Sequence, residues 1–293
     1  MSTKRAKSKD DGKAVTKRAG SKPRKSPKPP NDPHPKTAAA DTPVPPPPKT
    51  ATLEGAVSPQ PPEIGINFED LLNDLEDELG GHFLDLTLAL LCPSHLYDAH
   101  IINKAISGVG TDEHALIEVL CTRSNSELEL IKEAYHTEFR RNLEKDISNE
   151  VSGDFGRLMR SVVTATRDEN KELDSKLAET DAQKLTAGGV GKLGTDEVLF
   201  NHIFCLRSWP QLKATFEAYR RKNDIDIELD IRKEFHGEIR DALLTIVKVA
   251  KNMQSYFAEK LNEAMKGAGT DDEALIRVIV SRSEVVVNNF TFV

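Results

Sequence analysis

Three short segments of the sequence place glycine, threonine and acidic residues in the same order. They are Gly110-Thr111-Asp112-Glu113, Gly194-Thr195-Asp196-Glu197 and Gly269-Thr270-Asp271-Asp272. Glycine adopts backbone angles with φ > 0 that other residues avoid, so a glycine-rich loop can turn tightly and direct several carbonyl oxygens toward one point. Carbonyl oxygens gathered in this way are ligands for a hard cation.

Two of these segments are followed, at a fixed distance, by a carboxylate. In both cases 38 residues intervene between the threonine and a glutamate, from Thr111 to Glu150 and from Thr195 to Glu234, and a glycine stands three residues after the glutamate. A loop of carbonyls beside one carboxylate suits Ca²⁺, which takes about six to eight oxygen ligands, some of them from water or a bound ligand. Taken singly, the loops are plain helix connections and the glutamates solvated acids; the repeated spacing favours a cation site.

Helices are expected around each loop. The threonine can act as a helix N-cap by accepting a backbone N–H, and the acids after it suit the positive end of the helix dipole. Apolar residues then recur at helical spacing, and further helices are predicted over 96–106, 126–139 and 155–165.

The loops also mark a repeat. An arginine followed by serine stands 13 residues after each loop glycine, at Arg123, Arg207 and Arg282. We expect these arginines to close helix ends or to pair with acids rather than to bind phosphate. The loop glycines are 84 and 75 residues apart, so each unit is about that long and helical throughout.

Charge divides the chain into two parts. The formal charge of the whole is −7, but residues 1–62 carry 13 basic and 5 acidic side chains, or +8, which leaves −15 for residues 63–293. The same 62 residues hold 14 of the 16 prolines. Because proline runs cannot build a packed core, disorder with stretches of polyproline II is predicted there. Such a tail is consistent with a solubilising arm, a nuclear-import or nucleic-acid patch, an anchor to anionic lipid, or a ligand for an SH3-like or WW-like groove.

Composition also excludes several classes of protein. The most apolar stretch, Phe83 to Cys92, is ten residues long and contains Asp85, whereas a membrane-spanning helix needs about 20 apolar residues. No apolar region follows the basic N-terminus, so a secretory signal is not expected. Cys92, Cys121 and Cys205 lack CxxC spacing, which indicates core thiols in a reducing compartment rather than disulfides or a zinc site. We expect no enzyme, because no Ser/His/Asp order, HExxH motif or Walker loop occurs.

These motifs resemble those of the annexin family. The family's calcium motif is Met/Leu-Lys-Gly-x-Gly-Thr, then 38 residues, then Asp or Glu. The loop Met265-Lys266-Gly267-Ala268-Gly269-Thr270 fits it, and Ile106-Ser107-Gly108-Val109-Gly110-Thr111 fits much of it. Lys192-Leu193-Gly194-Thr195 looks like the version in the family's third repeat, and residues 93–99 resemble the junction between the first and second repeats. The resemblance covers roughly residues 68–285.

The resemblance implies an all-α fold, an annexin-like array of five-helix repeats. It contains half of repeat 1, complete repeats 2 and 3, and the first half of repeat 4. The implied boundaries are a disordered basic, Pro-rich tail over 1–65, the C-terminal half of repeat 1 over 66–95, repeat 2 over 96–167, repeat 3 over 168–251 and a partial repeat 4 over 252–293.

The resemblance also implies which residues bind calcium. By position they are Ile106, Gly108, Gly110 and Glu150 in the second repeat, Gly189, Lys192, Gly194 and Glu234 in the third, and Met265, Gly267 and Gly269 in the fourth. The two glutamates coordinate through their side chains and the other residues through backbone carbonyls. Phosphoryl oxygens of a lipid complete the coordination.

Two of the implied repeats depart from the family pattern. Glu78 stands at the carboxylate position of the first, but the matching loop position is Ala38, inside the tail. The fourth has its loop, while the position 40 residues after Gly269 lies beyond residue 293. Exposed helix faces in these partial repeats favour self-association. We also hypothesise that the two halves combine into one composite unit.

The resemblance implies a non-enzymatic protein that binds anionic, phosphatidylserine-like phospholipid membranes in the presence of Ca²⁺. It would be cytoplasmic and become peripheral on membranes when calcium rises. Charge supports this independently, because a body at −15 is repelled by anionic lipid unless a divalent cation bridges the two. The alternative is a calcium-independent scaffold or interaction protein. It would act through its basic tail on nucleic acid, lipid or an SH3/WW-like partner, and the tail also allows nuclear localisation.

Overall fold

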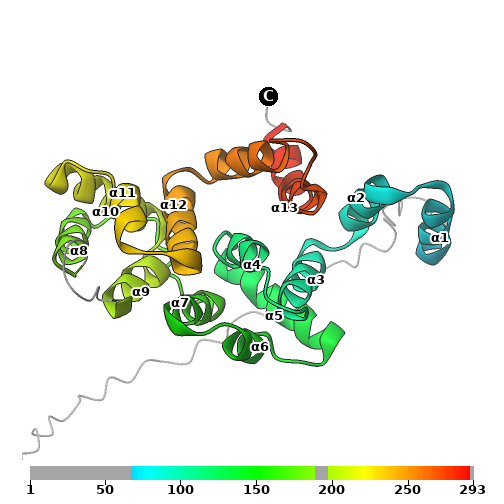
Figure 1. The fold of residues 1–293 in the computed structure, drawn as a ribbon, viewed down its shortest axis with the longest axis horizontal. Helices are drawn as coiled ribbons and strands as arrows, with labels where there is room; N and C mark the ends of the chain where they lie inside the picture. Colours follow the sequence, from blue (N-terminus) through cyan, green and yellow to red (C-terminus); the bar gives the residue numbers. More distant parts are fainter. Residues whose placement is uncertain (1–66, 189–196, 291–293) are drawn as a thin grey trace, which may run out of the picture. The chain divides into compact units, whose positions relative to one another are not determined.

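The computed structural model describes residues 67–188 and 197–290, with side chains described throughout except for Glu197 and residues 284–290. Every element within these ranges is a helix, which confirms the predicted all-α class (Figure 1). The predicted disordered tail over 1–65 lies outside the described residues.

The helices are named in chain order. They are α1 Phe68–Glu78, α2 Gly81–Leu91, α3 Ser94–Ile106, α4 Glu113–Leu120, α5 Asn125–Phe139, α6 Leu143–Glu150, α7 Gly153–Val163, α8 Ser175–Gly188, α9 Glu197–Leu206, α10 Trp209–Asn223, α11 Ile227–Glu234, α12 Gly237–Ala264 and α13 Asp272–Phe290. The helices predicted over 96–106, 126–139 and 155–165 correspond to α3, α5 and α7, each within two residues at either end.

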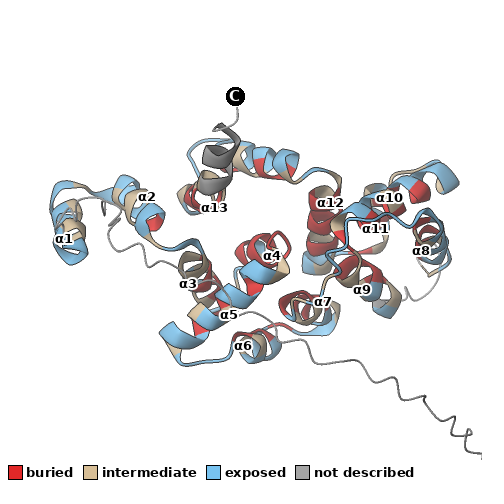
Figure 2. Cartoon of the chain, turned by 180° about the vertical axis from the view of Figure 1, so that it is seen from behind, coloured by how far each residue is buried: buried red, intermediate tan, exposed pale blue. Residues whose placement is uncertain are grey.

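Two successive groups of helices pack in the same way. In the first, α3 contacts α4, α5 and α6, and α6 contacts α7; in the second, α8 contacts α9 and α10, and α11 contacts α12. One apolar core runs through both groups, and the buried residues line the inward faces of the helices (Figure 2). Fully buried members such as Leu116, Tyr135 and Phe204 anchor it. This succession is compatible with the predicted five-helix repeats, whose boundaries stay a prediction.

The long helix α12 is two helices joined at a kink. Asn252 has extended backbone angles, φ −165° and ψ 103°. Its side-chain Oδ1 accepts the backbone N–H of Ser255 at 2.9 Å, as an N-cap does. The second half of α12 therefore starts as a new helix at the position where the fourth repeat is predicted to begin.

The helices α1 and α2 are less buried than the rest. No residue of α1 is buried and only Ala89 of α2 is, while Phe68 and Phe83 are 53% and 63% exposed. Helix α2 packs against α13, where Ala89 forms a small apolar cluster with Ile276 and Val280. The two partial repeats are thus in contact, as the composite-unit hypothesis requires.

The cysteines are partly as predicted. All three are free, and Cys121 and Cys205 are buried core thiols. The prediction was wrong for Cys92, which is only partly buried. It is the C-cap of α2, at the edge of the thinly covered α1–α2 segment, so no second layer of helices encloses it.

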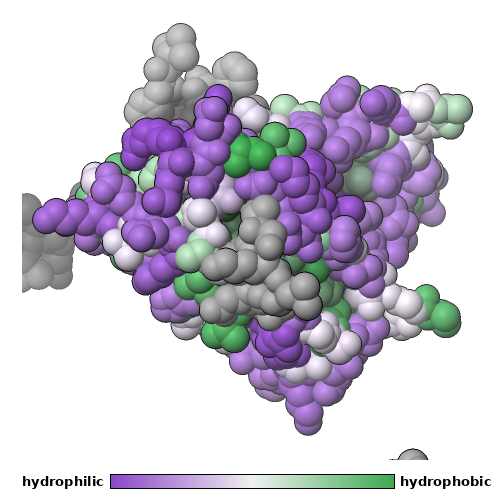
Figure 3. Space-filling model, turned by 60° about the vertical axis from the view of Figure 1, so that its left-hand side comes forward, coloured by the Kyte–Doolittle hydropathy of each residue, from purple (hydrophilic) through white to green (hydrophobic). Residues whose placement is uncertain are grey.

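The face drawn in Figure 3 is largely polar. Figure 3 shows one face on which hydrophilic residues predominate and apolar residues form small separate patches. In the part of the chain that the structure describes, no helix has both the length and the apolar character that a membrane span requires.

Candidate metal centre

The second-repeat loop joins α3 to α4. Ile106 ends α3, and Gly110 turns the loop with φ +89°. The loop is closed at its base because the backbone N–H of Asp112 donates to the carbonyl of Ala105 at 2.9 Å. This closure fixes where the segment from Ile106 to Gly110 sits and leaves Val109 at its tip, fully exposed.

Folding brings the distant carboxylate to this loop. Glu150 is the last residue of α6, and α6 contacts α3. The hydroxyl of Thr111 donates a hydrogen bond of 2.8 Å to Oε1 of Glu150, across 39 positions in the sequence. The structure therefore joins the two features that the spacing linked, although the ligand roles of Ile106, Gly108, Gly110 and Glu150 stay predictions.

The predicted role of threonine as helix cap is wrong at the second and fourth loops, and Thr195 of the third lies outside the described residues. Asp112, not Thr111, caps α4, and its Oδ1 accepts the backbone N–H of Ala115 at 3.0 Å. The fourth repeat repeats this arrangement, with Oδ1 of Asp271 accepting the N–H of Ala274 at 3.1 Å. An ionised carboxylate is the stronger acceptor, and its charge suits the helix N-terminus, so it displaces the neighbouring hydroxyl. The hydroxyl of Thr111 is thereby free to bond elsewhere.

The same type of junction between two helices follows each of three glutamates. Glu78, Glu150 and Glu234 are the last residues of α1, α6 and α11, and Gly81, Gly153 and Gly237 begin the helices that follow. These glycines have φ of 59°, 63° and 62°, a left-handed conformation that a side chain disfavours. The glycine three residues after each glutamate, noted in the sequence for Glu150 and Glu234, thus makes the sharp turn that leaves the carboxylate at a helix end.

The third site is described only in part. Gly189, Lys192 and Gly194, its predicted carbonyl ligands, lie outside the described residues. Glu234 is described, at the end of α11 and half-buried. It lines a small hollow with Tyr219 and Phe235.

The fourth loop closes in the same way as the second but differs from it at its first glycine and in its side-chain arrangement. Met265 is the C-cap of α12, and Gly267 and Gly269 have φ of +120° and +117°. The N–H of the residue after the threonine again closes the loop, here onto the carbonyl of Ala264 at 2.8 Å. The hydroxyl of Thr270, however, donates to Asp272, at 2.7 Å and only two residues away. In the described part of the chain no distant carboxylate is hydrogen-bonded to this threonine.

The donors gathered here fit a hard cation. Among the described residues, no group of three or more His, Cys, Asp or Glu side chains is placed to hold a metal ion. The second loop instead offers backbone carbonyls and the exposed carboxylate of Glu150, all of them oxygen ligands. Oxygen donors of mixed type, with positions left for water or a ligand, are what Ca²⁺ accepts.

The repeated arginines pair with acids, as predicted, in two of three cases. Arg123 makes a buried bidentate pair with Asp98 at 2.7 and 2.8 Å. Arg207 makes a partly buried bidentate pair with Asp181 at 2.6 and 3.4 Å. Arg282 differs, because it stacks on Phe257 at 4.2 Å from the ring centre. Its buried Nε has no hydrogen-bond partner, and burial lowers the pKa of its guanidinium.

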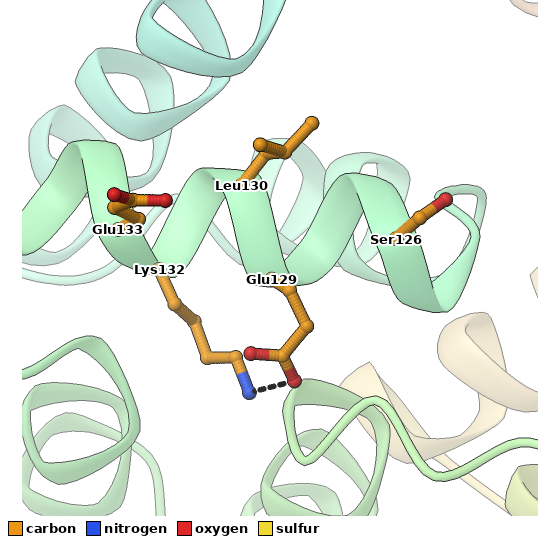
Figure 4. Close-up of a pocket in the computed structure, with 5 residues that line it drawn as sticks. All are labelled: Ser126, Glu129, Leu130, Lys132 and Glu133. Carbon is orange, nitrogen blue, oxygen red and sulfur yellow. Dashed lines mark hydrogen bonds and ion pairs between the residues drawn. The ribbon is translucent and has the colours of Figure 1, made fainter. Parts of the chain in front are cut away.

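A shallow hollow lies away from these loops, on the outer face of α5. It is lined by Ser126, Glu129, Leu130, Lys132 and Glu133 (Figure 4). Lys132 pairs with Glu129 at 2.6 Å on one side of the helix, and Leu130 points to the other. The hollow contains none of the predicted site residues.

Known proteins are similar to this chain in both sequence and fold. The Annexin family model matches residues 97–162, 180–246 and 256–286. The chain belongs to the annexin family. It is 48% identical to human annexin A7 over 217 residues, which cover 74% of this chain, and 47% identical to mouse annexin A13 over the same share. Among solved structures, annexin III aligns with a TM-score of 0.70 and 44% identity, over 73% of this chain and 66% of that one.

The chain spans only part of the length of these relatives. This chain spans only 44% of the length of annexin A7, but 68% of mouse annexin A13. A calcium-bound structure of annexin (Sm)1 aligns with a TM-score of 0.66 at 28% identity, over 73% of this chain and 65% of that one.

Thr111 of this annexin contacts a residue of the candidate site, but the sequence motif does not predict that contact. The sequence predicts a helix cap at this position because threonine is a good N-cap. The signal that points elsewhere is the aspartate directly after it, which is a better cap and leaves the threonine hydroxyl available.

Proposed function

We propose that this annexin binds anionic phospholipid membranes in a calcium-dependent and non-enzymatic manner, through its second and third repeats. The observation that carries the proposal is the hydrogen bond that holds Glu150 at the loop of Thr111, at 2.8 Å. It places the one distant carboxylate of the motif beside a closed, glycine-containing loop of carbonyl donors. Membership of the annexin family supports the same activity.

Each residue of the second-repeat site has a distinct task. The carbonyls of Ile106, Gly108 and Gly110 provide neutral oxygen ligands, and Glu150 provides the negative one. A bound Ca²⁺ supplies the positive charge that a lipid phosphate needs. Because these residues contribute only part of the coordination, phosphoryl oxygens can occupy the rest.

Charge explains why the cation is required. Residues 63–293 carry −15, so they are repelled by an anionic membrane within a Debye length, about 8 Å at physiological ionic strength. Val109 at the tip of the loop is fully exposed. Once the repulsion is removed, its apolar side chain is placed to touch the lipid surface.

The other two loops contribute unequally. The third-repeat ligands are Glu234 and the carbonyls of Gly189, Lys192 and Gly194. The fourth loop, with the carbonyls of Met265, Gly267 and Gly269, lacks a bonded distant carboxylate, and its threonine is turned toward Asp272. We therefore assign it the weakest calcium binding of the three. The protein would act at the cytoplasmic face of membranes when calcium rises.

Sedimentation with vesicles tests the proposal. The full chain is mixed with phosphatidylserine/phosphatidylcholine vesicles in Ca²⁺ or in chelator, and the bound fraction is measured against calcium concentration. We expect binding in Ca²⁺ and release by chelator. Glu150→Gln should raise the calcium concentration needed, and Glu150→Gln with Glu234→Gln should raise it further.

A matched variant separates the loss of a ligand from the loss of a charge. Glu133→Gln changes the net charge equally, but the residue is exposed on α5, away from the loops. It should bind like the unaltered chain. Binding that ignores chelator and falls with salt would reject the proposal, and would favour the alternative in which the basic tail, with its charge of +8, makes the contact.

A further inference from the structure

The hydroxyl of Thr111 is placed to control the carboxylate of Glu150. It donates to Oε1 of Glu150 at 2.8 Å. Glu150 is exposed at the end of α6, where its side chain otherwise has several rotamers open to it. A hydrogen bond from a fixed donor removes part of that freedom before any ligand arrives.

The donor is fixed for two reasons. Threonine is β-branched, so its χ1 angle has few accessible values. The backbone on either side is also held, because the N–H of Asp112 bonds to Ala105 at 2.9 Å and the Asp112 side chain caps α4. Thr111 thus presents its hydroxyl from a rigid base, while Glu150 is the mobile partner.

The fourth loop provides a comparison within the same chain. There Thr270 has the same place relative to the loop closure, yet its hydroxyl donates to Asp272 at 2.7 Å. The direction of the threonine hydroxyl is therefore not the same in the two loops. In each loop the hydroxyl donates to a carboxylate that lies within reach. At the second loop that carboxylate is the one belonging to the motif.

We propose that Thr111 is a positioning residue for the second-repeat site. It holds the Glu150 carboxylate against the loop in the metal-free protein and so lowers the entropy cost of cation binding. This inference rests on the proposed function for its effect on calcium, but the metal-free contact can be tested separately. The hydroxyl uses one lone pair of one oxygen and leaves the rest of the carboxylate to coordinate.

The first measurement uses no metal. Hydrogen exchange of the amides from Ser107 to Asp112 is followed in chelator for the full chain, Thr111→Val and Thr111→Ser. Valine keeps the shape of threonine without the hydroxyl, and serine restores the hydroxyl. We expect exchange to become about two- to tenfold faster in Thr111→Val, the effect of losing one hydrogen bond, and to return toward the original rate in Thr111→Ser. Thr270→Val is the matched control and should leave this segment unchanged.

The second measurement is a double-mutant cycle with Glu150→Ala, read both as exchange and as the calcium concentration for half-maximal vesicle binding. Thr111→Val should raise that concentration about two- to tenfold in the original chain. It should have no further effect once Glu150 is alanine, because the two residues act as one unit. If Thr111→Val fails to fold, Glu150→Ala removes the same bond from its other end and should speed exchange alike.

Two results would overturn the inference. One is unchanged loop exchange in both Thr111→Val and Glu150→Ala; the other is an effect of Thr111→Val that persists in full beside Glu150→Ala. Vesicle binding that does not depend on calcium would instead refute the proposed function, while the exchange experiment would still decide whether Thr111 positions Glu150.

Discussion

Breaking the buried ion pair between Glu118 of α4 and Arg277 of α13 should strongly destabilise the array. The two residues are 159 positions apart, and Arg277 donates to both carboxylate oxygens at 3.0 and 3.3 Å. Their side chains are only 4% and 8% exposed. Burial alone lowers the pKa of Arg277, but the charge of Glu118 and the hydrogen bonds outweigh it and raise that pKa, so the guanidinium stays charged.

Removing one partner should therefore leave a buried charge without compensation. We expect Glu118→Gln or Arg277→Met to lower the free energy of unfolding by about 3–5 kcal/mol. In a body of this size that corresponds to roughly 2–4 °C in Tm per kcal/mol. The double variant should cost less than the sum of the two single variants by about 2 kcal/mol, since it removes both charges.

Urea denaturation followed by circular dichroism measures these values, and an exposed pair between neighbouring elements is the control. Lys104 of α3 and Glu273 of α13 are 2.8 Å apart, and both side chains are 67% exposed. Glu273→Gln should cost less than about 1 kcal/mol, because water and salt screen such pairs. The reasoning fails if Glu118→Gln costs no more than Glu273→Gln, or if the two single effects at the buried pair simply add.

Two further predictions concern the thiols and a helix end. Burial raises the pKa of all three cysteine thiols, that of Cys205 to about 12, so little thiolate is present at pH 8 and the rate of labelling by a disulfide reagent should rise with pH. Cys92, partly exposed, should react first, and Cys121 and Cys205 only in urea; equal native rates for all three would contradict the described packing. Arg140, the exposed C-cap of α5, has φ +54°, so Arg140→Gly should stabilise the protein by about 0.5–1 kcal/mol, while Glu133→Gly inside the same helix should destabilise it by about 1 kcal/mol. A loss of stability at both positions would show that the left-handed angle carries no strain.

The spacing of residues in the sequence predicted those parts of the candidate site that depend on the local backbone conformation. The glycine after each glutamate and the glycines of the loops were visible in the sequence, because a left-handed residue leaves a clear signature. The distance of 38 residues from Thr111 to Glu150 was informative because it occurs twice. The pairing of Arg123 and Arg207 with acids followed from the general need of a buried charge for a partner.

Competition between neighbouring side chains was harder to predict. Thr111 and Asp112 are both good helix caps, and only the structure shows that the carboxylate takes the cap while the hydroxyl takes Glu150. Long-range partners left no local pattern at all. Nothing near Arg277 in the sequence points to Glu118, and nothing near Arg282 indicates that Phe257 stands where its counterparts meet an aspartate.

That last difference shows how the partial fourth repeat is attached. In the second and third units the repeated arginine is satisfied inside its own unit, by Asp98 or Asp181. In the fourth, Arg282 has an aromatic ring instead, and the charged contacts of α13 reach other units. Arg277 pairs with Glu118 of α4, and Glu273 of the first turn pairs with Lys104 of α3 at 2.8 Å. Asp272 of the same turn lies 3.3 Å from the ring of His82 in α2. Among the residues whose side chains the structure describes, α13 joins two small apolar clusters, and its buried Arg277 takes its compensating charge from a neighbouring unit. The loop that we propose as the fourth calcium site leads directly into this helix, so a change in these contacts should also be felt at that loop.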